Sequence, residues 1–142
     1  MNPGLSVFLL FLSENGFPNA TTTPIINALL KYRNVQINYL NITQYAEGTP
    51  MEEWIKKGEL SRSNYQTSHT SDVLRFLTLW KYGGTYLDLD VVVLKPVDTF
   101  SNYAGVESRE FIGSAIINFS QDGIGHDLVY MCVRLAELYF CY

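Results

Sequence analysis

Two acidic residues lie close together in the otherwise apolar stretch from Tyr82 to Leu94. If this stretch is a β-strand, its side chains alternate between two faces, so Asp88 and Asp90 share one face. Apolar side chains fill most of both faces, which is typical of a strand covered on both sides. Two carboxylates about 6–7 Å apart in such a strand repel each other by about 2–3 kcal/mol. Because burial adds a desolvation cost, we expect a cation beside them, and a divalent metal ion bound through oxygen is the natural candidate.

A helix is predicted directly before this stretch, and it carries two further charged residues. Apolar residues recur at helical spacing over residues 68–82, which indicates a helix with one buried face. Asp72 and Arg75 are three positions apart on it, so they lie on one face and can form an ion pair. Gly83 and Gly84 permit a sharp turn into the strand, because glycine adopts backbone conformations that other residues avoid. This turn would bring Asp72 and Arg75 beside the two carboxylates.

The first part of the chain reads as two strands with a helix between them. The apolar run Val7–Leu12 and the alternating run Val35–Leu40 indicate strands. Thr23 is a suitable N-cap for the intervening helix, and Pro24 is a suitable first helical residue. The strand–helix–strand order implies parallel strands joined by a right-handed crossover.

Alternating helix and strand signals continue to the end of the chain. A short helix is predicted over residues 51–57, a strand over residues 114–119 and a last helix from about Gly125. We therefore predict a single domain over residues 1–142 with an α/β fold and a mostly parallel central sheet. Ligands of such sheets bind at the carboxyl ends of the strands, where the acidic stretch lies.

The composition limits the classes of partner. The chain has 142 residues, of which 47% are hydrophobic, so it is expected to be globular. Its net charge is −4 and its 10 basic residues do not cluster, which argues against nucleic acid as a partner. An acidic protein that binds an anionic phosphate needs a cation, which agrees with the expected metal ion. The two cysteines, Cys132 and Cys141, match no zinc-binding spacing and are interpreted as buried thiols.

The sequence predicts no membrane anchor and no signal peptide in this chain. No apolar stretch approaches the roughly 20 residues that span a membrane, and no basic residue precedes Lys31. The last helical pattern stays apolar up to Tyr142 without a polar stop, so we expect a chain whose C-terminal part is missing. Glycosylation sequons that permit a secretory location occur at Asn19, Asn41 and Asn118.

The segment from Ser71 to Pro96 resembles the core motif of the DXD-containing sugar transferases of the α-1,4-glycosyltransferase type. In this sequence the motif consists of Ser71-Asp72, Arg75, Tyr82-Gly83-Gly84, Tyr86, Asp88 and Asp90. This pattern is far more specific than two acids alone, and looser similarity extends from the first strand to the last helix. Catalytic domains of this family are much longer than this chain, and the part that carries acceptor contacts is not present.

The resemblance implies a GT-A-type fold, which is a Rossmann-like α/β sandwich, and a UDP-sugar donor. It implies transfer of a hexose or N-acetylhexosamine to a glycan or glycolipid acceptor, with retention of the anomeric configuration. Asp90, supported by Asp88, would bind Mn²⁺ or Mg²⁺ beside the donor diphosphate, and these two acids would be the catalytic residues. A longer parent protein would lie in the Golgi lumen or membrane. The donor itself would be held by Asp72, Arg75, Gly83, Gly84, Tyr86 and Asp88.

Two other interpretations fit parts of the sequence. In a haloacid-dehalogenase-like phosphatase, Asp88 would be the nucleophile and Asp90 the acid/base. That class needs a distant downstream lysine and a later acidic pair, whereas the only lysine after Asp90 is the nearby Lys95. The second alternative is an inactive truncated fragment that acts at most as a nucleotide-sugar- or metal-binding module. The two histidines, His69 and His126, are interpreted as residues of helix starts and not of the site.

Overall fold

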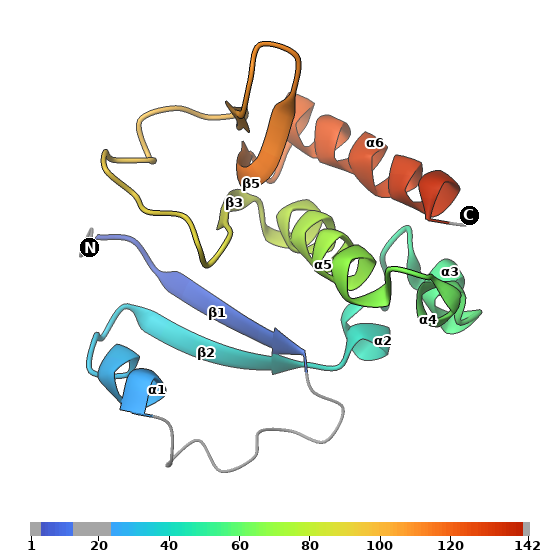
Figure 1. The fold of residues 1–142 in the computed structure, drawn as a ribbon, viewed down its shortest axis with the longest axis horizontal. Coiled ribbons are helices and arrows are strands. Elements are labelled where there is room, and N and C mark those ends of the chain that lie inside the picture. Colours follow the sequence, from blue (N-terminus) through green and yellow to red (C-terminus); the bar gives the residue numbers. More distant parts are fainter. Residues whose placement is uncertain (1–3, 13–23, 141–142) are drawn as a thin grey trace. The chain divides into compact units, whose positions relative to one another are not determined.

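The computed structural model describes residues 4–12 and 24–140 of the chain. These residues form five strands and six helices (Figure 1). The chain divides into two compact units, residues 1–45 and residues 46–142. None of the helices in the described part of the chain is long and apolar enough to cross a membrane.

The first unit contains a pair of parallel strands with a helix between them in the sequence. β1 (Val7–Leu12) and β2 (Val35–Leu40) pair in parallel along their whole length, and Figure 1 shows them side by side. α1 (Pro24–Leu29) lies between them in the chain, and the one-turn helix α2 (Ile42–Tyr45) follows β2. The predicted strand–helix–strand order and parallel pairing are therefore confirmed. The expected N-cap, Thr23, lies outside the described residues.

The second unit has four helices, of which α3, α5 and α6 lie close to where the sequence predicts them and α4 was not predicted. The short helices are α3 (Glu52–Lys56) and α4 (Glu59–Arg62), and the two long helices are α5 (Gln66–Tyr82) and α6 (Gly123–Tyr139). α5 and α6 pack against each other. The helical spacing of apolar residues thus predicted α5 within two residues of its observed start, because the stripe that defines the pattern faces the core.

The sheet of the second unit differs from the prediction. It has the strand order β3 (Gly84–Leu87), β5 (Ile112–Phe119), β4 (Tyr103–Val106), and β5 is antiparallel to both of its neighbours. The expectation of a mostly parallel central sheet is therefore wrong for this sheet, although the mixed α/β class is confirmed. The physical reason is the short connection between β4 and β5, which reverses the chain and makes the two strands antiparallel.

The predicted acidic strand is much shorter than expected. β3 ends at Leu87, and the backbone N–H of Asp88 makes one further bond to the carbonyl of Ala115 at 2.9 Å. The chain then turns, and the N–H of Val91 donates to the carbonyl of Asp88 at 3.2 Å. Leu89 is 89% exposed, so the interpretation of a strand covered on both faces up to Leu94 is wrong. Pairing stops because the turn moves the backbone away from β5.

The core of the second unit holds α5 and α6 against the sheet. Leu79 of α5, Ile117 of β5 and Val129 of α6 form a buried cluster. Partly buried aromatic residues of α5, β3 and β5 pack around this cluster, including Tyr86 of β3. Burying side chains of this size contributes about 1.5–3 kcal/mol each. The cluster therefore fixes the distance between α5 and the end of β3, where the charged residues lie.

The glycine pair after α5 makes the turn that the sequence predicts. The N–H of Gly83 donates to the carbonyl of Leu79 at 2.8 Å and ends the helix. Gly83 and Gly84 have φ angles of 61° and 94°, which side-chain-bearing residues rarely adopt. A Cβ on Gly83 would lie 2.6 Å from the backbone nitrogen of Gln121, so this position also requires the absence of a side chain.

Cys132 of α6 is half-buried and has no disulfide partner among the described residues. Burial raises the pKa of its thiol above the usual value of 9.0. Cys141 lies outside the described residues, so the interpretation of two buried thiols stays a prediction for that residue.

Candidate functional site

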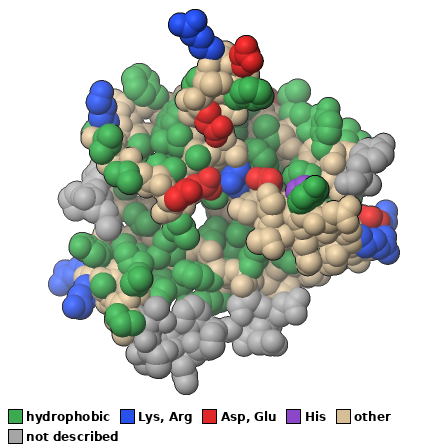
Figure 2. Space-filling view, viewed as in Figure 1, with side chains coloured by type: hydrophobic (Ala, Val, Ile, Leu, Met, Phe, Trp, Pro, Cys, Tyr) green, Lys and Arg blue, Asp and Glu red, His purple; other side chains and the backbone are tan. Residues whose placement is uncertain are grey.

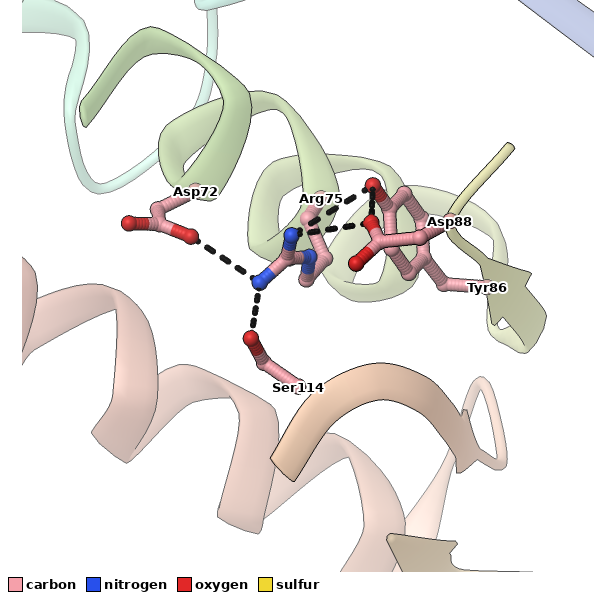
Figure 3. A network of polar contacts seen from close by, with 5 residues as sticks. All are labelled: Asp72, Arg75, Tyr86, Asp88 and Ser114. Atoms are coloured by element: carbon pink, nitrogen blue, oxygen red, sulfur yellow. Dashed lines mark hydrogen bonds and ion pairs between the residues drawn. The ribbon is translucent and has the colours of Figure 1, made fainter. Parts of the chain in front are cut away.

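Four side chains, from α5, β3, the residue after β3 and β5, meet around the guanidinium of Arg75, and we call these five residues the Arg75 cluster (Figure 3). Arg75 Nη1 donates to Asp72 Oδ1 at 2.9 Å and to the hydroxyl of Ser114. Arg75 Nη2 donates to Asp88 Oδ1 at 3.1 Å and lies 3.5 Å from the Tyr86 hydroxyl. Arg75 is only 5% exposed. A buried cation thus lies between two carboxylates that are each about a third exposed (29% and 30%).

Local structure explains why these residues meet. Asp72 and Arg75 are one helical turn apart, so the predicted ion pair between them is confirmed. Tyr86 and Asp88 alternate along β3 and its extension, so their side chains point to the same side. Ser114 lies on β5 beside Ala115, whose carbonyl accepts the Asp88 N–H. The pairing of β3 with β5 therefore sets the position of Asp88 against the helix.

Tyr86 contacts both Arg75 and Asp88. Its hydroxyl donates to Asp88 Oδ1 at 2.6 Å, and the Arg75 guanidinium carbon lies 4.6 Å from the centre of its ring. This geometry is that of a cation–π contact. Burial, and after it the hydrogen bond to Asp88, raises the pKa of the Tyr86 phenol above its usual value of 10.0. The phenol therefore keeps its proton at neutral pH and donates a hydrogen bond to the carboxylate.

Asp90 does not belong to the Arg75 cluster. It lies in the turn after β3, is exposed, and makes no hydrogen bond or ion pair with any described residue. The expectation that both acids share one covered strand face is thus wrong. The cation that compensates Asp88 within the protein is Arg75, whereas solvent hydrates Asp90 at little cost.

Acidic side chains gather near the middle of the face shown in Figure 2, beside one basic side chain. No group of three or more His, Cys, Asp or Glu residues in the described part of the chain could by itself hold a metal ion. Two nearby carboxylates nevertheless suit a Mg²⁺- or Mn²⁺-type ion, which usually takes one or two carboxylates and completes its shell with phosphates and water. Asp88 and Asp90 are thus of a suitable chemical type to bind such an ion together with a phosphate ligand.

Sequence reasoning found four of the five residues of the cluster and missed one. Asp72, Arg75, Tyr86 and Asp88 come together as expected (Figure 3). Gly83 and Gly84 form the turn from α5 into β3 and do not belong to the cluster. Ser114 was missed because it lies 39 positions away from Arg75 in the sequence. The available signal was a hydroxyl at the start of the otherwise apolar strand pattern 114–119.

The histidines have other surroundings. His69 Nδ1 lies 2.6 Å from the Ser63 hydroxyl, and its ring stacks on Phe140 with the centroids 3.9 Å apart. The ring of His126 packs against Trp80 at 5.5 Å, and its Nδ1 is buried without a partner among the described residues. Neither ring is part of the Arg75 cluster, so both act here as packing residues.

Residues 6–107 match the protein family described as the glycosyltransferase sugar-binding region containing a DXD motif. The chain belongs to this glycosyltransferase family. Similar relatives are the lactosylceramide 4-alpha-galactosyltransferases of Rattus norvegicus and Mus musculus, which are 33% and 32% identical over 77% and 84% of this chain. The alpha-1,4-N-acetylglucosaminyltransferase of Homo sapiens is 28% identical over 72% of this chain.

This member of the glycosyltransferase family is similar to only part of each relative. The chain spans 29%, 33% and 30% of the lengths of these three relatives, respectively. No solved structure matches the chain. The matched region contains the DXD sequence Asp88-Leu89-Asp90 together with Asp72 and Arg75, whereas Ser114 lies beyond its end at residue 107.

Proposed function

We propose that this chain is the donor-binding part of a metal-dependent glycosyltransferase. The reaction is the transfer of a hexose or N-acetylhexosamine from a UDP-sugar to a glycan or glycolipid, with retention of the anomeric configuration. The observation that carries the proposal is the arrangement of the DXD sequence within the family match. One carboxylate, Asp88, is oriented by Arg75 and Tyr86, and the other, Asp90, is exposed and unpaired among the described residues.

The fold proposed for the chain is the GT-A type, with residues 1–142 forming part of one nucleotide-sugar-binding domain. The parallel pair β1 and β2, with a helix between them in the sequence, supports this proposal, because such units build nucleotide-binding α/β domains. The glycosyltransferase family match over residues 6–107 supports it as well.

Asp90 and the second oxygen of Asp88 are the proposed ligands of a divalent ion, Mn²⁺ or Mg²⁺. Within the described residues, hydrogen bonds engage only Oδ1 of Asp88, which leaves Oδ2 without a hydrogen bond (Figure 3). When bound, such an ion supplies the positive charge that stabilises a diphosphate leaving group. The protein itself orients Asp88 through the hydrogen bonds from Arg75 and Tyr86.

The proposed donor-binding residues lie on α5, in the turn that follows it, on β3 and directly after β3. The carboxylates of Asp72 and Asp88 are partly exposed, so they can accept hydrogen bonds from sugar or ribose hydroxyls. Nothing lies within 4 Å of a Cβ added at Gly84, so this glycine leaves space for a ligand, whereas the backbone of Gln121 fills the space beside Gly83. The complete proposed set is Asp72, Arg75, Gly83, Gly84, Tyr86 and Asp88.

A second candidate function follows from the length of the chain. Because the chain spans about a third of its relatives, it can act as a nucleotide-sugar- or metal-binding module without turnover. The names of the relatives suggest a glycolipid acceptor and hence a Golgi location for the whole protein. Release of UDP from UDP-galactose in the presence of lactosylceramide separates the enzyme from the module, because only the enzyme turns over.

Calorimetric titration of UDP into the folded chain tests the proposal. We expect binding in the presence of Mn²⁺ and none after the metal is removed with EDTA. Equal binding in both conditions would contradict the metal dependence. Absence of binding in both conditions would contradict the assignment of a donor site to this chain.

A further inference from the structure

Two of the glycosylation sequons fall on described residues, and their side chains have different surroundings. The first covers residues 41–43, between β2 and α2, and the second covers residues 118–120, at the end of β5 (Figure 1). Both asparagines, Asn41 and Asn118, are partly exposed, so exposure alone does not separate the two sites. The hydrogen bonds of each side-chain amide do separate them.

Asn41 uses only the oxygen of its side-chain amide in the fold. Its Oδ1 accepts the backbone N–H groups of Thr43 at 3.0 Å and of Gln44 at 3.2 Å, which is the usual pattern of a residue that precedes a helix. Its Nδ2 makes no hydrogen bond with any described residue, and neither does the hydroxyl of Thr43, which is an exposed residue. The asparagine nitrogen and the hydroxyl that define a sequon are thus both available.

Asn118 uses both ends of its side-chain amide. Its Nδ2 donates to the hydroxyl of Thr85 at 2.8 Å, and its Oδ1 accepts the backbone N–H of Asn102 at 2.9 Å. The hydroxyl of this sequon, on Ser120, donates to the carbonyl of Asp122 at 2.8 Å. The amide of Asn118 therefore connects β5 with β3 and with the turn before β4, and both groups that define this sequon take part in the fold.

Opening the fold around each sequon also has a different cost. The helix α2 has only four residues, and the bonds of Asn41 reach two and three positions along the chain, so opening this turn breaks few contacts. Asn118 pairs with residues of both β3 and β4, and its neighbour Ile117 belongs to the buried cluster. Core strands of this kind open far more rarely than loops and short helices. An enzyme that must bind the sequon therefore reaches Asn41 much more often than Asn118.

We propose that Asn41 is a site of N-linked glycosylation and that Asn118, despite its sequon, is a structural residue without a glycan. The inference rests on the proposed function only for the location, because this modification takes place in the lumen of the secretory pathway. In the reaction, Nδ2 of Asn41 forms a bond to C1 of the first sugar of a lipid-linked oligosaccharide. The bond from C1 to the lipid diphosphate breaks, its electron pair leaves with the diphosphate, and the nitrogen releases one proton.

The test presents the folded chain and two unfolded peptides to the same enzyme. A purified single-subunit oligosaccharyltransferase and a lipid-linked oligosaccharide carry out the reaction, and mass spectrometry gives the glycan occupancy of each site over time. Every chain carries Asn19→Gln, which removes the sequon that lies outside the described residues. The peptides cover residues 37–47 and 114–124 and show how each sequon reacts without the fold. Cooperative thermal unfolding, followed by circular dichroism, establishes that the chain is folded.

We expect both peptides to be modified. In the folded chain we expect Asn41 to react at least about tenfold faster than Asn118, because a short turn opens far more often than a central strand. Equal rates at the two sites of the folded chain would overturn the inference. An unmodified Asn41 in a chain whose peptide reacts would overturn it as well.

A second arm uses cells and matched variants that each remove one sequon. The full chain follows a cleavable signal peptide in a eukaryotic cell, and a gel shift that peptide N-glycosidase reverses counts the glycans. We expect one glycan, which Thr43→Ala abolishes and Ser120→Ala leaves in place. No glycan, or a glycan that depends on Ser120, would contradict the proposal. Neither arm contains UDP, so failure of the proposed function in the calorimetric titration is distinguishable from failure of this inference.

Discussion

Asp88 and Asp90 are two positions apart in the sequence, yet their side chains have different surroundings in the fold. Asp88 accepts hydrogen bonds from a buried guanidinium and a phenol, whereas Asp90 lies exposed in a turn without a partner among the described residues. The difference teaches that the two acids of one short motif need not form a symmetric pair. The protein orients one of them, and the other keeps its full capacity to bind a ligand.

The largest difference between the two acids is expected when Arg75, the cation beside Asp88, is removed. We expect Arg75→Met to lower the free energy of unfolding by about 2–4 kcal/mol, because it leaves Asp88 and Asp72 without their counter-charge. The estimate lies below that for a fully buried pair, since both carboxylates are partly exposed. The measurement is urea denaturation followed by the fluorescence of Trp54 and Trp80, which both lie in the second unit.

Arg134→Met is the matched control for that experiment. Arg134 also forms an i,i+3 ion pair, with Glu137, but its side chain is 53% exposed. Exposed pairs contribute about 0–1 kcal/mol. Equal losses of stability in Arg75→Met and Arg134→Met would show that the Arg75 cluster is no more than a surface ion pair.

The glycine turn joins α5 to β3, and we expect its substitution to have the next largest effect on the free energy of unfolding. We expect Gly83→Ala to cost about 1–3 kcal/mol, because it combines a positive φ with a close contact to the Gln121 backbone. Gly58→Ala is the control, since Gly58 has a φ of 77° but nothing within 4 Å of the added Cβ. A cost for Gly83→Ala that is no greater than for Gly58→Ala, by the same denaturation measurement, would argue against the close contact.

We expect the smallest effect on the free energy of unfolding from a substitution in the exposed turn after β3. We expect Leu89→Ser to change the free energy of unfolding by no more than about 0.5 kcal/mol, because Leu89 is 89% exposed. The comparison is Leu79→Ala, in which a 2% exposed core residue is truncated at a cost of about 2–5 kcal/mol. If Leu89→Ser destabilises the chain as strongly as Leu79→Ala, the predicted covered strand is right and the exposed turn is wrong.

Local features of the fold could be predicted from the sequence. The helical spacing of apolar residues located α5, the glycine pair located the turn, and the separation of Asp72 from Arg75 gave their ion pair. The crossover between β1 and β2 followed from the order of their signals. Each of these features depends on residues that are neighbours in the sequence or on the order of elements.

Features that depend on distant partners could not be predicted. The apolar pattern continues from Tyr86 to Leu94, so only the pairing with β5 shows that the strand ends at Leu87. The hydroxyl of Ser114 reaches Arg75 only after β5 has paired with β3. From the sequence we expected a cation beside both acids, with a divalent metal ion as the natural candidate, and we expected Arg75 to come beside them. Only the fold shows that Arg75 pairs with Asp88 while Asp90 is exposed to water.

The most direct test of the account is Mn²⁺ binding in the presence of UDP, measured from the electron paramagnetic resonance signal of free Mn²⁺. Asp90→Asn is compared with Asp127→Asn, which changes an exposed acid on α6. We expect Asp90→Asn to weaken Mn²⁺ binding by about tenfold or more while its unfolding free energy stays unchanged, and we expect Asp127→Asn to bind Mn²⁺ like the unmodified chain. Unchanged Mn²⁺ affinity in Asp90→Asn would contradict the assignment of the exposed acid as the metal ligand.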